Sequence, residues 1–276
     1  MNYGRTSLRR RAKQLDARGT RIRHKIGVIL GKLLLIGIIV GGCATVSFGV
    51  GAFKGILASA PDISEVDVIP TGYSTKVLAA DGSETAKLVA AGSNRQYVTI
   101  DQIPENLQHA VVAIEDERFY DHNGIDLKGI VRALVADVRT RDFSQGASTL
   151  TQQLIKNNVL SEQWANENDS NISKMEKMER QVQRKIQEQY LAIELEKKVN
   201  DKNWILENYL NSINLGSNTL GVQAAAQRYF GKDVSKLTLS ECAVIAGITK
   251  NPAGYNPILH PKENAKRRKN VLDAMK

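Results

Sequence analysis

The run EDER at residues 115–118 closes an apolar, helix-like segment and is the first place in the sequence where chemistry could occur. At about 100° per residue, Glu115 shares a helix face with Val111, whereas Asp116 and Glu117 are predicted to turn away from it. A carboxylate among apolar side chains loses hydration, which suits it to act as a general base. A helix-end charge cluster, with Glu115 at the rim of the core, is the alternative.

A second polar segment, GASTLTQQLIKNN at residues 146–158, combines a helix start with amides and a lysine. Ser148 or Thr149 is placed to cap the helix N-terminus. A helix N-terminus, two amides and a lysine suit the binding of phosphate and sugar hydroxyls. A capped surface helix also explains the segment. The polar side chains concerned are Gln152, Gln153, Lys156 and Asn157.

A third segment, RKIQEQYLAIELE at residues 184–196, places Arg184 and Glu188 four positions apart on one helix face. The alternative is a solvated ion pair, which would contribute only about 0.2–0.5 kcal/mol. Leu191 and Leu195 extend apolar character onto this face, which indicates that the face is covered. A fourth segment, residues 202–232, is rich in aromatic residues at helical spacing that are expected in the core.

The elements that must position these residues are mostly helices. Apolar spacing predicts one helix from Pro104 and others over 127–139, 174–198, 202–210, 221–230 and 239–248. The helix over 174–198 carries an apolar stripe that begins at Met175 and Met178. Two strand-like arms over 73–89 predict a β-hairpin, and the polar stretch 161–173 predicts a loop.

Charge separates the N-terminus from the rest of the chain. Residues 1–32 contain ten Lys or Arg and one acidic residue, and therefore hold the whole net charge of +9. The remaining 28 basic and 28 acidic residues cancel, which argues against a nucleic-acid groove. The uncharged run 33–53 has the roughly 20 residues that a membrane helix needs, and the basic residues before it predict a cytoplasmic N-terminus.

The predicted organisation is a basic cytoplasmic tail (1–32), a transmembrane anchor (33–53), a stalk (54–70) and an extracytoplasmic domain (71–276). A cleaved signal peptide and a lipoprotein site at Cys43 are the alternatives. However, the apolar run continues ten residues beyond Cys43, and no small-x-small site closes it. Cys43 and Cys242 are not expected to form a disulfide, and no cluster of His and Cys has metal-ligand spacing.

Taken in order, the four segments resemble the peptidoglycan glycosyltransferase domain of class A penicillin-binding proteins and of monofunctional transglycosylases. The family pattern is E-D-x-x-F-x-x-H-x-G, G-x-S-T-x-x-Q-Q-x-x-K-N, R-K-x-x-E-x-x-x-A and a final Y-L-N to Y-F-G block. Each motif alone is weak, but four in order are highly specific. The matching residues include Glu115, Asp116, Phe119, His122, Gly124, Gly146, Ser148, Thr149, Gln152, Gln153, Lys156, Asn157, Arg184, Lys185, Glu188, Ala192, Tyr209, Gly216, Gly221 and Gly231.

The resemblance implies a mainly α, lysozyme-like fold of two lobes, the smaller of which dips toward the membrane. It implies that Glu115 is the catalytic base and Glu188 a second essential carboxylate. Lys156 and Arg184 would hold the donor's pyrophosphate. A divalent metal ion, Mg²⁺ or Mn²⁺, is also expected, with Glu188 as its ligand. The other expected substrate-binding residues are Asp116, Ser148, Thr149, Gln152, Gln153, Asn157 and Lys185.

The implied reaction polymerises lipid II, a disaccharide-peptide α-linked to undecaprenyl pyrophosphate, into a β-1,4-linked glycan strand with inversion. Glu115 would take the proton of the acceptor's 4-hydroxyl, and the good leaving group would need no acid. The expected partners are lipid II, the growing glycan strand, the bacterial membrane and other proteins of cell-wall synthesis and division. Nucleic acid is not among them.

Two other functions remain open. A hydrolase or lytic transglycosylase would also use one glutamate on a lysozyme-like fold, but it would need neither the Lys156 and Arg184 pair nor an anchor. A silent glycan-binding scaffold would need neither Glu115 nor Glu188. The transpeptidase motifs S-x-x-K, S-D-N and K-T-G do not occur in these 276 residues. The chain is therefore expected to be a monofunctional enzyme or the first part of a bifunctional one.

Overall fold

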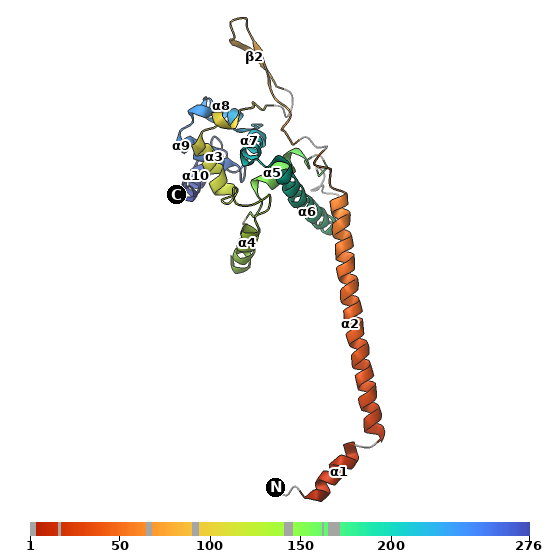
Figure 1. Cartoon of the computed structure of the whole chain (residues 1–276). Helices are drawn as coiled ribbons and strands as arrows, with labels where there is room; N and C mark the ends of the chain where they lie inside the picture. The colour runs from red at the N-terminus through yellow and green to blue at the C-terminus, as the bar shows by residue number, and fades with distance from the viewer. Residues whose placement is uncertain are drawn as a thin grey trace. The chain divides into compact units, whose positions relative to one another are not determined.

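The structure is a computed structural model that describes residues 4–15, 18–64, 68–89, 94–140, 146–161, 163–164 and 172–276. Within these ranges lie ten α-helices and one two-stranded sheet (Figure 1). The chain divides into two units, Met1–Ser59 and Ala60–Lys276. The predicted mainly α class, with a small hairpin and an apolar N-terminal helix, is confirmed.

The N-terminal unit consists of α1 (Arg5–Leu15) and α2 (Arg18–Ala58). Over Ile22–Ala58, α2 is long and apolar enough to cross a membrane, and it is the one such helix in the described part of the chain. Its large apolar side chains are exposed, with Phe48 at 80%. The predicted anchor, residues 33–53, lies inside this helix. The helix continues five residues into the predicted stalk, to Ala58, and residues 65–67 of that stalk lie outside the described residues.

Most helices of the second unit follow the predicted apolar spacing and bury an apolar face. The helix over Leu127–Thr140 is an exception, because its Leu127, Val131 and Val135 side chains are exposed. One helix was not predicted from the sequence: α10, which begins with Pro261 at its first position, where a missing N–H costs nothing. The eight helices are α3 (Glu105–Glu115), α4 (Leu127–Thr140), α5 (Leu150–Asn158), α6 (Lys174–Val199), α7 (Lys202–Ser212), α8 (Val222–Phe230), α9 (Leu239–Ile248) and α10 (Pro261–Ala274).

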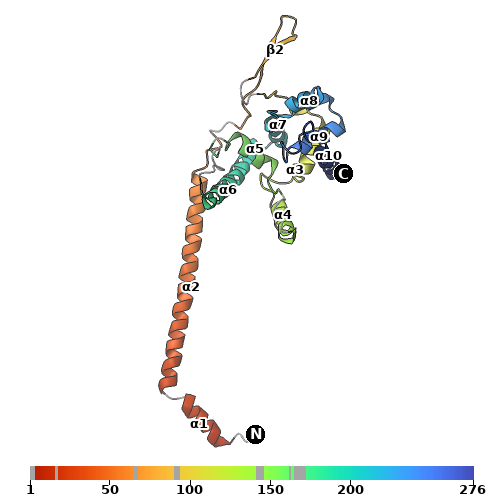
Figure 2. The ribbon, with the colours of Figure 1, turned by 180° about the vertical axis from the view of Figure 1, so that it is seen from behind.

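The hairpin consists of β1 (Thr75–Leu78) and β2 (Glu84–Leu88), which pair antiparallel as predicted. The turn between them contains Gly82 at φ +82°, a conformation that a residue without Cβ adopts easily. In both Figure 1 and Figure 2 the hairpin extends away from the helical body. None of its residues lines the cleft described below.

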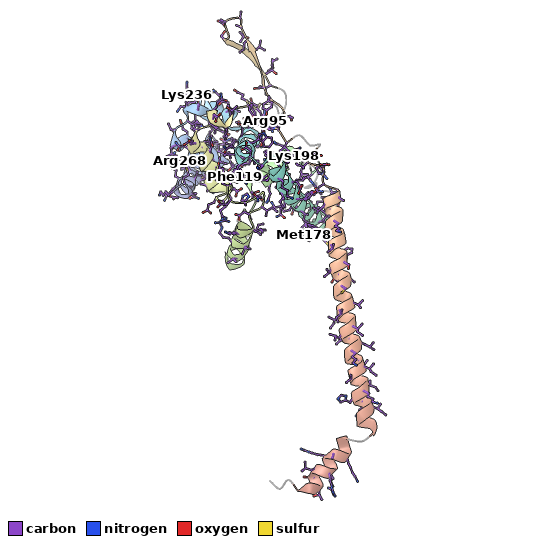
Figure 3. All side chains as sticks on the ribbon, in the orientation of Figure 1. Arg95, Phe119, Met178, Lys198, Lys236 and Arg268 are labelled. Carbon is purple, nitrogen blue, oxygen red and sulfur yellow. The ribbon has the colours of Figure 1, made fainter. Side chains whose placement is uncertain are left out.

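The core is centred on α9, whose residues 242–248 are all buried. It packs against α3 and α10, while α5 packs against α6 and α7. Phe119, labelled in Figure 3, is fully buried in the turn after α3. By contrast, the first half of the apolar stripe on α6 is exposed, with Met178 at 60% (Figure 3). The buried face of α6 is instead the one that carries Leu191 and Leu195.

Candidate active site

A cleft of about 830 Å³ collects the polar motif residues that are far apart in the sequence. It contains both predicted catalytic carboxylates and five cationic side chains, so its formal charge is positive. Such a surface favours an anionic ligand such as a phosphate. The lining residues are Ile114, Glu115, Gly146, Ser148, Gln153, Lys156, Arg184, Lys185, Glu188, Thr249, Lys250 and Arg267.

Glu115 is the last residue of α3, and its side chain is 14% exposed. Each carboxylate oxygen accepts one hydrogen bond from a neutral donor. Gln153 Nε2 donates to Oε2 at 3.1 Å, and Thr249 Oγ1 donates to Oε1 at 2.5 Å. The guanidinium of Arg267 lies 3.9 Å from Oε1. Three other helical segments therefore fix the direction of this carboxylate at the wall of the cleft.

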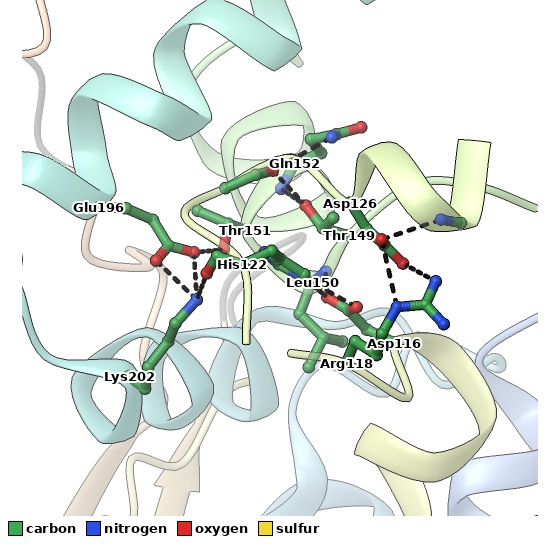
Figure 4. Close-up of polar contacts among 12 residues, drawn as sticks. Asp116, Arg118, His122, Asp126, Thr149, Leu150, Thr151, Gln152, Glu196 and Lys202 are labelled. Carbon is green, nitrogen blue, oxygen red and sulfur yellow. Dashed lines mark hydrogen bonds and ion pairs between the residues drawn. The ribbon is translucent and has the colours of Figure 1, made fainter. Parts of the chain in front are cut away.

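Asp116 lies behind the cleft rather than in it. The helix ends at Glu115, and Asp116 takes φ −156° and buries its side chain. Its carboxylate accepts the His122 Nε2–H at 2.9 Å and the Leu150 N–H at 2.9 Å (Figure 4). The prediction that Asp116 turns away from the apolar side is wrong, because a helical periodicity no longer applies after Glu115. Glu117 is exposed, as predicted.

The turn after α3 is fastened to the start of α5. Thr149 caps α5 by accepting the Gln152 N–H, and its hydroxyl donates to Gly124 O at 2.7 Å. The Gln152 side chain donates to the same carbonyl at 3.2 Å. Gly124 has φ +85°, and a Cβ there would lie 2.7 Å from backbone atoms of Ala192 on α6. Thr149 and Gln152 are therefore buried and hold the turn between α5 and α6.

Glu188 is buried and neutralised by two cations of its own helix. Its side chain is only 3% exposed, Arg184 Nη1 pairs with Oε1, and Lys185 Nζ lies 3.1 Å from Oε2. Lys185 also donates to Ser148 Oγ at 2.7 Å and to Gln152 Oε1 at 2.9 Å. The prediction that this face of the helix is covered is confirmed, and the solvated ion pair is excluded for Glu188.

Lys156 and Lys250 are the exposed cations of the cleft. Among the described residues, neither ammonium makes a hydrogen bond or an ion pair. Both are therefore available to an incoming anion. Arg267 is 12% exposed, and its buried Nε has no hydrogen-bond partner in the described part of the chain.

Three lining residues were not identified from the sequence: Thr249, Lys250 and Arg267. They lie at the end of α9 and in α10, where the sequence shows only a T-K-N-P run and a basic cluster. Asn157, which was predicted to bind substrate, is exposed and does not line the cleft. The predicted residues that do line it are Glu115, Ser148, Gln153, Lys156, Arg184, Lys185 and Glu188.

A second polar network lies behind the first and ties α7 to the same turn. Lys202 Nζ donates to His122 O at 2.6 Å and pairs with the buried Glu196 at 2.6 Å (Figure 4). Glu196 in turn accepts the Thr151 hydroxyl at 2.6 Å. The Lys202 ammonium also lies 4.6 Å from the centre of the Phe119 ring, within cation–π range. This network ties α5, α6 and α7 to the turn that follows Glu115.

The donor set does not fit a resident divalent metal ion at Glu188. Both of its oxygens already face cationic side chains, which would repel a dication. The described residues also contain no group of three or more His, Cys, Asp or Glu side chains that could hold one. Mg²⁺ or Mn²⁺ would require several oxygen ligands.

Comparison with known proteins gives one family. The model of the family described as Transglycosylase matches residues 81–276. Penicillin-binding protein 1A of Clostridium novyi is 39% identical over 236 residues, which cover 82% of this chain and 26% of that protein. Penicillin-binding protein 1A/1B of Bacillus subtilis is 38% identical over 245 residues, covering 88% and 24%. Penicillin-binding protein 1A of Aquifex aeolicus is 46% identical over 181 residues, covering 66% and 23%.

The chain thus spans about a quarter of the length of these relatives. A crystal structure of penicillin-binding protein 1A from Haemophilus influenzae aligns with a TM-score of 0.37 at 24% identity, over 75% of this chain and 18% of that one. That similarity is too low to bear on the fold. The family match, by contrast, covers well over half of the sequence. The chain therefore belongs to the transglycosylase family.

Proposed function

We propose that this chain is a peptidoglycan glycosyltransferase that polymerises lipid II into β-1,4-linked glycan strands and releases undecaprenyl pyrophosphate. The observation that carries the proposal is the cleft itself, which an oriented carboxylate, Glu115, lines together with five cations. Membership of the transglycosylase family supports the same reaction class. A sugar transfer from a pyrophosphate requires both a base for the acceptor and positive charge for the leaving group.

Glu115 acts as the general base. A carboxylate has about four lone-pair positions, and Gln153 and Thr249 occupy one on each oxygen. The remaining positions can accept the proton of the acceptor's 4-hydroxyl while that oxygen attacks the anomeric carbon of the donor. The attack comes from the side opposite to the leaving pyrophosphate, so the α-linked donor gives a β-linked product.

The cations stabilise the leaving group. The bond from the anomeric carbon to the pyrophosphate oxygen breaks, and that oxygen takes the electron pair. Lys156 and Arg184 on the cleft wall would stabilise the charge that develops. Glu188 is a positioning residue in this scheme, because it orients Arg184 and Lys185 rather than exchanging a proton. Pyrophosphate leaves without protonation, so a second acid is unnecessary.

The apolar helix α2 gives the enzyme access to its substrate. A lipid-linked donor keeps its tail in the bilayer, so a membrane-held enzyme meets it at the surface. The basic residues of 1–32 favour a cytoplasmic N-terminus, which would place the catalytic domain outside the cell. The growing glycan strand is the second substrate. Other proteins of cell-wall synthesis and division remain predicted partners.

The test separates polymerisation from cleavage. Purified full-length chain in detergent is given lipid II in one reaction and preformed glycan strands in another, and the lengths of the products are measured. Longer strands from lipid II, with preformed strands unchanged, are expected. Shortened strands without any polymer would contradict the proposal and favour a hydrolase or lytic transglycosylase. Neither activity would favour the glycan-binding scaffold.

A further inference from the structure

The hydroxyl of Tyr209 is buried two hydrogen bonds away from the base, and its contacts point to a role. Tyr209 lies on α7, has no exposed surface, and does not line the cleft. Its hydroxyl donates to Gln153 Oε1 at 3.1 Å, and Gln153 Nε2 donates to Glu115 Oε2 at 3.1 Å. We propose that Tyr209 is a positioning residue that fixes the amide of Gln153 so that it donates to the Glu115 carboxylate. This inference rests on the proposed function.

The two hydrogen bonds run in one direction, from Tyr209 through Gln153 to Glu115. A glutamine amide has one acceptor end and one donor end. If the Gln153 amide were reversed, its oxygen would face a carboxylate oxygen of Glu115 and two acceptors would meet. The buried Tyr209 hydrogen would then have no acceptor, since Gln153 Oε1 is its one partner among the described residues. A buried donor without a partner costs about 1–3 kcal/mol, which selects the observed orientation.

These two hydrogen bonds connect three helices, from α7 through α5 to α3, and they end on one oxygen of Glu115 only. Thr249 at the end of α9 holds the other oxygen. Two independent donors therefore fix the plane of the carboxylate. Burial, and then the nearby Glu115 and Asp116 carboxylates, raise the pKa of Tyr209 well above its ordinary value. The hydroxyl thus keeps its proton and remains a donor throughout any pH range suited to the reaction.

Removing only the hydroxyl tests the role. Tyr209→Phe keeps the packed ring and leaves Gln153 free to turn its amide. We expect kcat for lipid II polymerisation to fall about 5–10-fold, the effect of one lost hydrogen bond, while KM stays unchanged because Tyr209 does not touch the cleft. Tyr229→Phe is the matched control, since its hydroxyl donates to Leu215 O away from the cleft. It should leave kcat unchanged.

A double-mutant cycle separates positioning from a merely structural role. Gln153→Met already removes both hydrogen bonds that Gln153 makes to Tyr209 and Glu115. Adding Tyr209→Phe should therefore lower kcat no further. If the two losses multiply, or if Tyr209→Phe has wild-type kcat, the inference is overturned. Should Tyr209→Phe fail to fold, wild-type kcat in Gln153→Met alone would overturn it equally. The rate of Glu115→Gln is measured alongside to keep the two proposals apart. A folded and active Glu115→Gln would contradict the proposed base. If Glu115→Gln is inactive, a cycle without coupling between Tyr209 and Gln153 contradicts only the role of Tyr209.

Discussion

The two carboxylates of the cleft differ in their surroundings, and the difference assigns their roles. Glu115 accepts hydrogen bonds from the neutral groups of Gln153 and Thr249, whereas Glu188 is buried between Arg184 and Lys185. Both oxygens of Glu188 are occupied by cations at ion-pair distance, whereas Glu115 has two neutral donors and one guanidinium 3.9 Å away, and keeps free lone pairs that face the cleft. The proposed base is therefore Glu115, and Glu188 holds the cations in place.

The first prediction concerns those cations. Lys156→Ala and Arg184→Ala should each slow polymerisation by about 10², because each removes one group that stabilises the leaving pyrophosphate. Arg184→Lys should recover the rate only in part, since an ammonium cannot reproduce a forked guanidinium contact. Single-turnover rates on lipid II give the measurement. Lys197→Ala removes an exposed lysine of α6 that pairs with Glu194, and should be neutral. Near-normal rates in both Ala variants would refute the assignment.

Sequence reasoning located most of the cleft at this scale but not all of it. Glu115, Gln153, Lys156, Arg184 and Glu188 were predicted, because the family motifs carry them. Lys250 and Arg267 were missed because they reach the cleft only through the packing of α9 and α10 on α3. No spacing in the sequence encodes that packing. The prediction for Asp116 was wrong because a single non-helical residue changed its direction.

At the scale of elements, the site depends on how the turn after α3 meets α5 and α6. Three groups converge there: the Thr149 hydroxyl and Gln152 amide, which donate to Gly124 O, and the Asp116 carboxylate, which accepts the Leu150 N–H. The turn is therefore set by hydrogen bonds from the first residues of α5. A change of backbone at Gly124 should disturb all of them.

The second prediction separates conformational strain from collision. Gly231→Ala places a side chain at φ +64° with no atom within 4 Å, so it should cost about 1–2 kcal/mol of unfolding free energy. Gly124→Ala has a similar positive φ but also meets Ala192 backbone atoms at 2.7 Å, so its cost should be clearly greater. Thermal unfolding of both variants in the same detergent gives the comparison. Equal losses would show that the turn does not press against α6.

The third prediction concerns pH and the start of α9. Glu241 belongs to a capping box with Thr238, and Lys232 lies 2.7 Å from its Oε1. The Lys232 hydrogen bond, followed by the Thr238 backbone N–H, lowers the pKa of Glu241. The stability it confers is fully present above the unfolded pKa, about 4.3, and is lost as pH falls through the lower folded pKa.

Glu241→Gln can still accept the Thr238 N–H but cannot pair with Lys232. Its melting temperature should therefore lie below that of the wild type at pH 7, and the gap should close as pH falls below about 4. Melting curves from pH 7 to pH 3 provide the measurement. A gap that stays constant over this range would mean that the charge of Glu241 contributes nothing.

The helices could largely be predicted, because six of them carry apolar residues at helical spacing, whether or not that spacing marks a buried face. The exception is α10, whose buried residues are only Asn264 and Val271. So small an apolar face leaves no periodic signal. The apolar stripe on α6 correctly predicted a helix, but it was expected to be buried. Its first half is exposed, including Met175 at 77%.

At the scale of the whole molecule, the chain combines an apolar helix with a helical catalytic domain. The fourth prediction is that residues 60–276 lie outside the cell. Protease added to intact protoplasts should remove this domain and leave a membrane-held fragment that contains residues 1–32. Inside-out vesicles, as the control, should lose the tail and keep the domain. A domain protected in intact protoplasts would contradict the proposed topology.

The claim on which the account depends most is that Glu115 is the base, and the rate of lipid II polymerisation by Glu115→Gln tests it most directly. Glutamine keeps the size of the side chain but cannot take the acceptor's proton, so the rate should fall by about 10²–10⁴. Glu117→Gln is the matched control, because Glu117 is 64% exposed and pairs with Arg132. It should polymerise at close to the wild-type rate, with both variants melting as the wild type does. A folded Glu115→Gln that polymerises as fast as the wild type would contradict the account and make Glu188 the first alternative.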